Sequence, residues 1–474
     1  MGSLFSALNT AADALSAFQQ AIDVTQNNVA NANSPGYAKQ VPLMEAVDIQ
    51  SANGVVGGVT EQTQDTRNAF ADAAVQQQQS LLGEFQQLQT SLAPLQGILD
   101  VSSNSAIPSA LTQLFQSFSQ WSTQPSNATY QNAVISAAQN TAAAFQTVAS
   151  QLNSASASTT KDLQSTVAQI NQDAAQIQSY NASVAAGDSN PGLSAQLEST
   201  LENLSGLANI QVLKGIGGTV TVLLGNQTPL VIGTQVNAIS AGNNTASNSG
   251  NPSASPTISI FDADGNDITN EITSGSLAGL LNTRNSLLPS LIGGGQQVGG
   301  LNTLAQGLAD TINNVLAQGS TTTTPPYQPG SPLFTYNPAS PSGIASSLAV
   351  SSTITGSALA AASPGPPFTA NGTALTLAGL DTSTPGPING EGFTQYFGSL
   401  VSTVGNAVNN ANAGATAQAG LVAQAKSLQQ QVSGVSLDEE AVRLVQLQGA
   451  YQAASKVVTV IDQSLQSLLA LIPA

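Results

Sequence analysis

Apolar side chains recur at alternating intervals of three and four residues at both ends of the chain. The first series runs from Leu4 to Val29, with one polar interruption at Thr25, and the second runs from Leu444 to Ile472. This heptad spacing is the pattern of a coiled-coil seam and predicts one long helix at each end. The seam positions are Leu4, Leu8, Leu15, Phe18, Ile22 and Val29 in the first helix, and Leu444, Leu447, Tyr451, Val458, Ile461, Leu465 and Leu468 in the second.

The interior of the chain carries further helical patterns. Heptad spacing from Leu81 to Leu99 predicts another helix, in which Pro94 is expected to cause a kink. Residues 126–186 contain neither Gly nor Pro, and they predict one helix about 90 Å long or two collinear helices. Apolar spacing that begins at Phe393 predicts a helix running toward Gln431.

Between these helices the pattern changes to short β-rich runs. Such runs occupy residues 217–233 and 257–269, and Asp264-Gly265 suits a tight hairpin turn. The acidic stretch "DADGND" also invites a calcium-loop interpretation, which requires Gly at its sixth position and Glu at its twelfth. Counted from Asp262, those positions hold Asp267 and Thr273, so the sequence favours the hairpin.

The helical pattern returns at residues 276–317 and is followed by a proline-rich stretch. Between Pro325 and Pro387 lie 11 of the 22 prolines, and the apolar positions there show little periodicity. Segments of this composition are usually surface connections that tolerate change. We therefore expect residues 320–390 to form an irregular, peripheral insertion with a few short strands.

The order of these patterns predicts a nested architecture. The fold class is mainly α with a smaller β-rich outer domain, and the two terminal helices pair as coiled-coil-like rods. The expected inner domain comprises residues 1–60 with 435–474. The expected helical middle domain comprises residues 61–208 with 276–434, including the insertion 320–390, and residues 209–275 form the outer domain.

An Asn-rich stretch, "NNVANANSPGYAKQ", ends the first helix. Carboxamide side chains can satisfy the last helical carbonyl groups or adopt left-handed geometry, Pro prevents continuation, and Gly permits a positive φ. The stretch therefore predicts an abrupt stop and an outward turn of the chain. The residues of this turn motif are Asn28, Asn31, Asn33, Pro35, Gly36 and Tyr37.

The last helix begins with the capping-box sequence "SLDE". The Ser436 hydroxyl can accept from the backbone N–H of Glu439, whose carboxylate can reach back to the cap. Asp438, Glu439 and Glu440 also complement the positive end of the helix dipole. A metal site or an acid/base pair is the alternative interpretation of these acids, and the cap explains them without such chemistry.

Composition narrows the possible functions. The chain has 474 residues, only 7% of them charged, and its formal charge is −17. Such a chain lacks the basic surface that nucleic acid or an anionic membrane would need. Cysteine and histidine are absent, which excludes disulfides and thiol chemistry and removes the commonest general base and transition-metal ligand. We expect no cofactor and no metal, although a glycosidase-like carboxylate pair stays open.

Targeting signals are also missing from the sequence. The N-terminus has neither a basic region nor a continuous apolar core of a secretory signal, and no run of about 18 apolar residues predicts a membrane span.

Four motifs together resemble the axial proteins of the bacterial flagellum. "NNVANANSPGYAKQ" is similar to the N-terminal signature shared by rod, hook and hook-associated proteins. Three others are most similar to the hook-associated family of the hook–filament junction: "DTRNAF" at 65–70, "ITSGSLAGLLNTRNSLLPSL" at 272–291 and "SGVSLDEEAVRLVQLQGAYQAASKVV" at 433–458. The insertion 320–390 has no clear counterpart in that family.

The resemblance implies a structural subunit without catalysis. Such proteins leave the cell through the flagellar type III export channel with no cleaved signal peptide, and they assemble as a ring of subunits outside the cell. The resemblance makes the seam positions the expected assembly interface, and it implies the hook protein, a filament-side junction protein and an export chaperone as partners. The alternatives are another axial subunit, of the hook, rod or flagellin type, or a carboxylate-based enzyme domain displayed on a flagellar scaffold.

Overall fold

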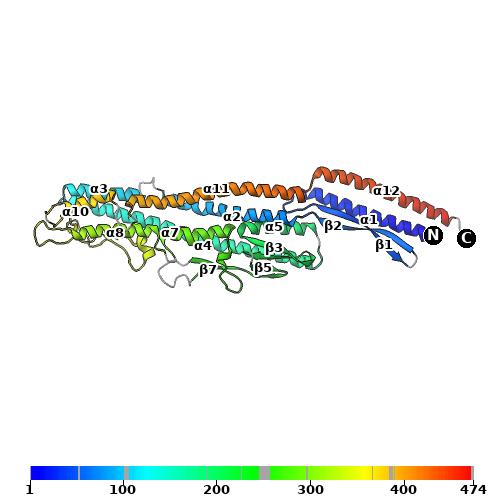
Figure 1. Cartoon of the computed structure of the whole chain (residues 1–474), viewed down its shortest axis with the longest axis horizontal. Helices are drawn as coiled ribbons and strands as arrows, with labels where there is room; N and C mark the ends of the chain where they lie inside the picture. Colours follow the sequence, from blue (N-terminus) through cyan, green and yellow to red (C-terminus); the bar gives the residue numbers. More distant parts are fainter. Residues whose placement is uncertain are drawn as a thin grey trace.

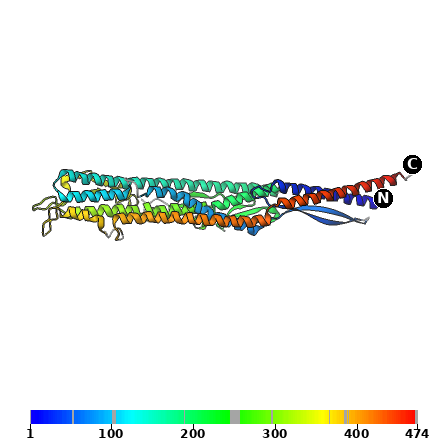
Figure 2. The same ribbon diagram turned by 90° about the horizontal axis from the view of Figure 1, so that it is seen from above.

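The chain forms a long rod with both termini at the same end (Figure 1). This computed structural model describes residues 2–470 except 52–53, 101–105, 189, 226, 245–256, 295–296, 366, 384–387 and 389. Turned by 90°, the rod stays narrow, and the terminal helices continue beyond the end of the helical shaft (Figure 2). The predicted fold class, mainly α with a smaller β-rich part, is confirmed.

The terminal part of the rod contains two helices and one hairpin. Helix α1 (Gly2–Ala30) packs along α12 (Leu437–Leu469), as the heptad seams predicted. Strands β1 (Gln40–Ser51) and β2 (Gly54–Asp65) pair antiparallel over their whole lengths and lie against α1. No strand was predicted here, and the expected domain boundary at residue 60 falls inside β2.

The shaft is built from long helices packed side by side. Helix α4 (Ala128–Ala185) is one uninterrupted helix of 58 residues, which confirms the prediction from the Gly- and Pro-free stretch. Helix α11 (Phe393–Ser433) packs on α2 (Ala69–Ile98), which includes Pro94 within its length. Helices α3 (Ile107–Thr123), α5 (Pro191–Leu207) and α8 (Gly300–Gln318) complete the main shaft.

The outer domain consists of short strands that cover one side of α4. Strands β3 (Ile210–Lys214), β4 (Val220–Leu224), β5 (Thr228–Ile232) and β6 (Gln235–Val236) form one sheet in that order. Strand β7 (Ser240–Asn244) pairs with β8 (Thr257–Phe261). The expected turn after β8 is present, with φ of +84° at Gly265. It is closed by one Phe261–Asp267 bridge rather than by a full second strand.

The chain returns to the shaft through three short helical segments. Helix α6 (Ser276–Asn282) continues into a π-helical turn, η4 (Thr283–Leu287), and then into α7 (Leu288–Ile292). The proline-rich stretch that follows α8 contains β9 (Phe334–Thr335), α9 (Ile344–Ser347), β10 (Ala349–Val350) and α10 (Gly372–Ala378).

The prediction that residues 320–390 are peripheral is wrong. Side chains from this stretch are buried in the same hydrophobic cluster as the shaft helices α3, α4 and α8. The apolar residues are scattered between prolines without helical or strand periodicity, so their burial could not be recognised from spacing. Those in the cluster include Leu333, Phe334, Ile344, Leu348, Leu359, Leu377 and Ile388.

Candidate assembly site

Three segments of the chain cross where the terminal part meets the shaft, and we call this region the joint. It comprises residues 27–40, 65–68 and 433–440. The Lys39 backbone N–H donates to the Ser433 carbonyl at 2.8 Å, and the Thr66 N–H donates to the Lys39 carbonyl at 2.9 Å. The Ser433 hydroxyl donates to the Thr66 carbonyl at 3.1 Å. The joint therefore ties both chain ends to the hairpin.

Asn28 is the polar centre of the joint, and its side chain is 1% exposed. Its Nδ2 donates to the Gln40 carbonyl at 2.8 Å and to Glu440 Oε2 at 2.9 Å. Its Oδ1 accepts from the Gln40 backbone N–H at 2.9 Å and from the Tyr37 hydroxyl at 3.0 Å. One carboxamide thereby joins α1, β1 and α12, because it offers donors and acceptors on the same group.

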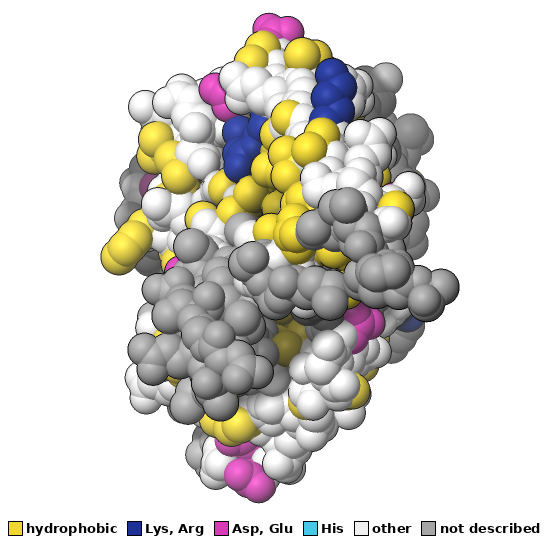
Figure 3. Space-filling view, turned by 90° about the vertical axis from the view of Figure 1, so that its right-hand side faces the viewer, with side chains coloured by type: hydrophobic (Ala, Val, Ile, Leu, Met, Phe, Trp, Pro, Cys, Tyr) yellow, Lys and Arg dark blue, Asp and Glu magenta, His cyan; other side chains and the backbone are white. Residues whose placement is uncertain are grey.

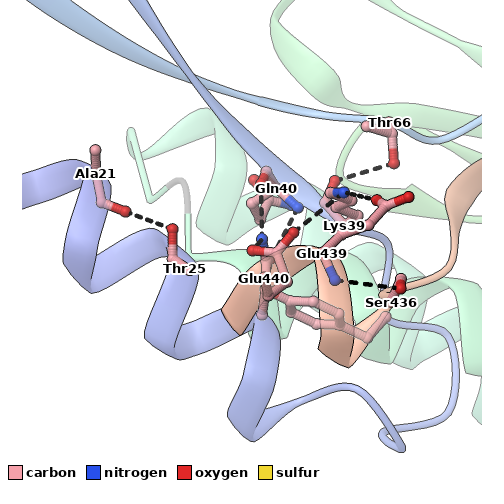
Figure 4. A network of polar contacts seen from close by, with 10 residues as sticks. Ala21, Thr25, Lys39, Gln40, Thr66, Ser436, Glu439 and Glu440 are labelled. Carbon is pink, nitrogen blue, oxygen red and sulfur yellow. Dashed lines mark hydrogen bonds and ion pairs between the residues drawn. The ribbon is translucent and has the colours of Figure 1, made fainter. Parts of the chain in front are cut away.

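The acidic start of α12 does more than cap the helix. Lys39 Nζ lies 2.9 Å from Glu439 Oε2 and 3.1 Å from Glu440 Oε1 (Figure 4). The Ser436 hydroxyl accepts from the Glu439 N–H at 3.5 Å, so the capping bond is long, and the Glu439 carboxylate turns to Lys39 rather than to the cap. The predicted capping box therefore does not by itself explain the acidic residues at the start of α12. Asp438 is exposed, whereas Glu440 is 1% exposed.

The rest of the Asn-rich motif stops the helix as predicted. Asn31 Nδ2 donates to the Asn27 carbonyl at 3.0 Å, which satisfies one of the last helical acceptors. Gly36 has φ of +71°, and a Cβ there would collide with the backbone of Ala195 in α5. Asn33 and Pro35 are exposed in the turn. Burial, and secondarily Glu440, raises the pKa of Tyr37 to about 12.

Arg67 fastens this turn to the shaft. Its Nη2 donates to the Gly36 carbonyl at 2.7 Å, and its Nη1 lies 3.3 Å from Glu198 Oε2 on α5. The side chains of Arg67 and Glu198 are 7% and 5% exposed, so this ion pair is almost completely removed from water. A buried pair of this kind is costly to break, because the remaining charge would stay desolvated.

A cavity of about 790 Å³ lies beside this ion pair, between α2, α5 and β3. Asp72 and Glu198 line it, and both are nearly buried. Gln429 Nε2 donates to Asp72 Oδ1 at 2.8 Å, while Asp72 Oδ2 has no described hydrogen-bond partner. Burial raises the pKa of Asp72, and burial together with the Asp72 charge raises the pKa of Glu198 to about 7, against the opposing effect of Arg67.

Glu198 is expected to make stability depend on pH. Its pKa of about 7 in the folded protein lies above the ordinary glutamate value of 4.5, so the folded state binds the extra proton between these values. Stability should fall as the pH rises through this window, by about 3–4 kcal/mol at 1.4 kcal/mol per pKa unit. In thermal unfolding from pH 5 to pH 8, Glu198→Gln should flatten the curve relative to wild type. An equally steep dependence of stability on pH in this variant would show that a group other than Glu198 causes it.

Asn28→Ala is expected to loosen the terminal part selectively. The substitution leaves the Gln40 N–H and Glu440 Oε2 without a buried hydrogen-bond partner, at a cost of about 1–3 kcal/mol for each group. Limited proteolysis should then cut within residues 1–60 and 437–470 faster than in wild type, with the main thermal transition of the shaft retained. Asn27→Ala, at an exposed neighbouring position, is the matched control. Equal protection of both variants would contradict a joint centred on Asn28.

The seam residues of α1 and α12 are mostly half-buried. Ile22 is buried, and Leu4, Leu8, Leu15 and Phe18 are half-buried. On α12, Leu444, Leu447, Val458, Ile461 and Leu465 are half-buried, while Tyr451 is 36% exposed. Val29 is 42% exposed and lies outside the packed part of the seam. The side chain of Leu468 lies outside the described residues. Thr25 is buried and donates to the Ala21 carbonyl at 2.8 Å, which explains how the seam accommodates it.

The opposite face of α12 is also apolar. Val442, Val445, Val457 and Val460 expose 59%, 69%, 52% and 61% of their surfaces. Val442 and Val460 are 18 residues, or five turns, apart, so they lie on one face. Seen from the end formed by the terminal helices, hydrophobic side chains gather beside Lys and Arg (Figure 3). We call these four valines the outer face of α12.

Two negative findings apply to the described part of the chain. None of its helices is long and apolar enough to cross a membrane. It also contains no group of three or more acidic side chains arranged to hold a metal ion.

Comparison with known protein families agrees with the two-part architecture. Residues 92–334 match the helical domain of the flagellar hook-associated protein FlgK. Residues 8–37 match the flagella basal body rod protein family, and residues 427–471 match the C-terminal family of flagellar basal body rod FlgEFG proteins. These matches define the class of the chain as a structural, axial component of the bacterial flagellum. Because the helical-domain match spans just over half of the chain, the protein belongs to the flagellar hook-associated protein FlgK family.

Individual relatives support this assignment. Flagellar hook-associated protein 1 of Bacillus subtilis (strain 168) is 27% identical over 518 aligned positions, which cover 99% of this chain and 98% of that protein. The protein of the same name from Salmonella typhimurium is 26% identical over 65% of this chain and 56% of its own length. The solved structure of the flagellar hook junction protein FlgK from Burkholderia pseudomallei has the same fold, with a TM-score of 0.64 at 18% identity, over 76% of this chain and all of that one.

Sequence reasoning missed several residues of the joint. Lys39 and Arg67 received no role, and neither did Glu198 on α5, although Lys39 and Arg67 form the main ion pairs of the joint. A usable signal existed, because only 8 of the 474 residues are Lys or Arg. Each cation in so acidic a chain is a candidate for a buried ion pair.

Proposed function

We propose that this subunit forms the hook–filament junction by assembling through its terminal part with further copies of itself, the hook protein and a filament-side junction protein. The observation that carries this proposal is that α12 is apolar on two opposite faces. One face is half-buried, and the outer face exposes two pairs of valines, Val442 with Val445 and, further along the helix, Val457 with Val460. Exposed apolar surface of this extent indicates a protein contact.

The proposal includes no catalytic step. The two carboxylates in the cavity beside the joint resemble an acid/base pair, since the pKa of Glu198 is raised. Both are engaged in structural contacts, Glu198 with Arg67 and Asp72 with Gln429. Structural ion pairs perturb pKa values as catalytic sites do, and these contacts favour the structural role. Export without a cleaved signal peptide, and an export chaperone, belong to the same proposal.

Immunogold labelling of isolated flagella tests the proposed location. Gold particles should lie at the boundary between hook and filament, and a strain lacking the gene should make hooks without filaments. Labelling along the filament or the rod would favour another axial subunit. Digestion of peptidoglycan by the pure protein would favour the displayed-enzyme alternative.

A further inference from the structure

A second exposed apolar surface lies on the shaft, where α2 and α11 run side by side next to the joint. Phe70 exposes 90% of its surface, and Leu421, Leu428 and Val432 expose 46%, 52% and 46%. We call these four residues the lateral patch. It is separate from the outer face of α12.

The structure holds Phe70 in this exposed position. Asn68 caps α2 by accepting from the backbone N–H groups of Phe70 at 3.0 Å and Ala71 at 3.1 Å. Ala71 and Asp72, the next two residues, are buried, so the first turn of the helix is anchored. An aromatic ring held in water by a capped and anchored turn has no packing role inside its own subunit.

The contacts of α11 show which flank the patch occupies. Its three α11 residues are spaced by seven and four, so they share one face of the helix. The adjoining face meets α2, where Gln429 reaches Asp72. The far flank of α11 meets α5, where Lys426 Nζ lies 2.8 Å from Glu202 Oε2. Helical geometry therefore places Phe70 and the α11 residues on the flank of the α2–α11 pair that faces away from α5.

We propose that the lateral patch docks against a second copy of this chain, as a contact between neighbouring shafts in addition to the terminal helices. Copies that each carry a charge of −17 repel one another least where their surfaces are uncharged. Within the 41 residues of α11 the single charged residue is Lys426, which points to the other flank. Val432 also lies five residues before α12 begins, so the patch continues the proposed terminal contacts along the rod. This inference rests on the proposed function, because it needs an array of subunits.

Photo-crosslinking in assembled flagella tests the identity of the partner. p-Benzoylphenylalanine at position 70 keeps an aromatic side chain there, and irradiation should give a product of twice the subunit mass that contains this chain alone. The same residue at Gln86, exposed on another side of α2, is the control and should give none. Absence of a product from position 70, or a product with a different flagellar protein, would overturn the proposal. Missing gold label at the junction would instead contradict the proposed function itself.

Substitution of the patch gives a second, independent measurement. Phe70→Ser with Leu428→Ser should leave the thermal transition of the monomer unchanged, because both side chains are exposed. It should raise the subunit concentration needed for assembly in vitro at least tenfold, whereas Phe70→Leu should stay close to wild type. Assembly of the double variant at the wild-type concentration would refute a docking role.

Discussion

Replacement of Ile461 by Asp is expected to abolish stable assembly while the shaft of the subunit stays folded. Ile461 lies on the seam of α12 against α1 and is half-buried before any neighbour is added. Loss of such a side chain costs about 2–5 kcal/mol when it is fully packed. A carboxylate without a cation adds several kcal/mol more, or forces its own protonation. Lys456, the nearest cation on the helix, lies on the exposed side.

The effect should be visible on cells. Strains that carry Ile461→Asp should release soluble subunit into the medium and build hooks without filaments. The thermal transition of the purified subunit should match wild type, because the two hydrophobic clusters of the rod contain none of the described side chains of α12. Gln448→Asp, which adds the same charge at an exposed position of the same helix, should behave as wild type. Normal filaments on Ile461→Asp cells would remove the seam from the proposed assembly interface.

Phe334→Ala should destabilise the whole shaft, although the residue belongs to the proline-rich stretch. Phe334 is 1% exposed within the larger hydrophobic cluster. Asn313 on α8 holds its backbone in place, since Oδ1 accepts from the Phe334 N–H at 3.0 Å and Nδ2 donates to its carbonyl at 2.8 Å. Removal of a buried aromatic ring costs about 3–5 kcal/mol.

Urea unfolding of the purified subunit measures this loss. The midpoint should shift to lower urea for Phe334→Ala and stay unchanged for Thr324→Ala, an exposed position in the same stretch. For the same reason, a Gly/Ser linker in place of residues 320–390 should give a subunit that does not fold cooperatively. Two variants with equal midpoints would restore the interpretation of this stretch as peripheral.

Long helices could be predicted because their signal is local. The spacing from Leu4 to Val29, the Gly- and Pro-free run that became α4, and the spacing after Phe393 each lie within one element. The stop at Gly36 was predictable for the same reason, since a positive φ and a proline act on the residues beside them.

The contacts between distant segments could not be predicted in this way. Lys39 meets Glu439 across 400 residues of sequence, and Arg67 meets Glu198 only because the turn after α1 packs on α5. The hairpin of β1 and β2 was also not predicted from the sequence. Pro42 weakens the first strand signal, and three glycines within residues 54–65 weaken the second.

Helix α4 belongs to both hydrophobic clusters of the rod. Its buried apolar residues from Val134 to Leu152 join the larger cluster, and those from Leu163 to Ile177 join the cluster of the outer domain. Between them, residues 153–162 have the sequence NSASASTTKD, and their one apolar contact with either core is Ala155, partly buried against the larger cluster. Ser and Thr are weaker helix formers than Ala or Leu. We therefore expect this ten-residue span to be the part of α4 that bends most readily under load.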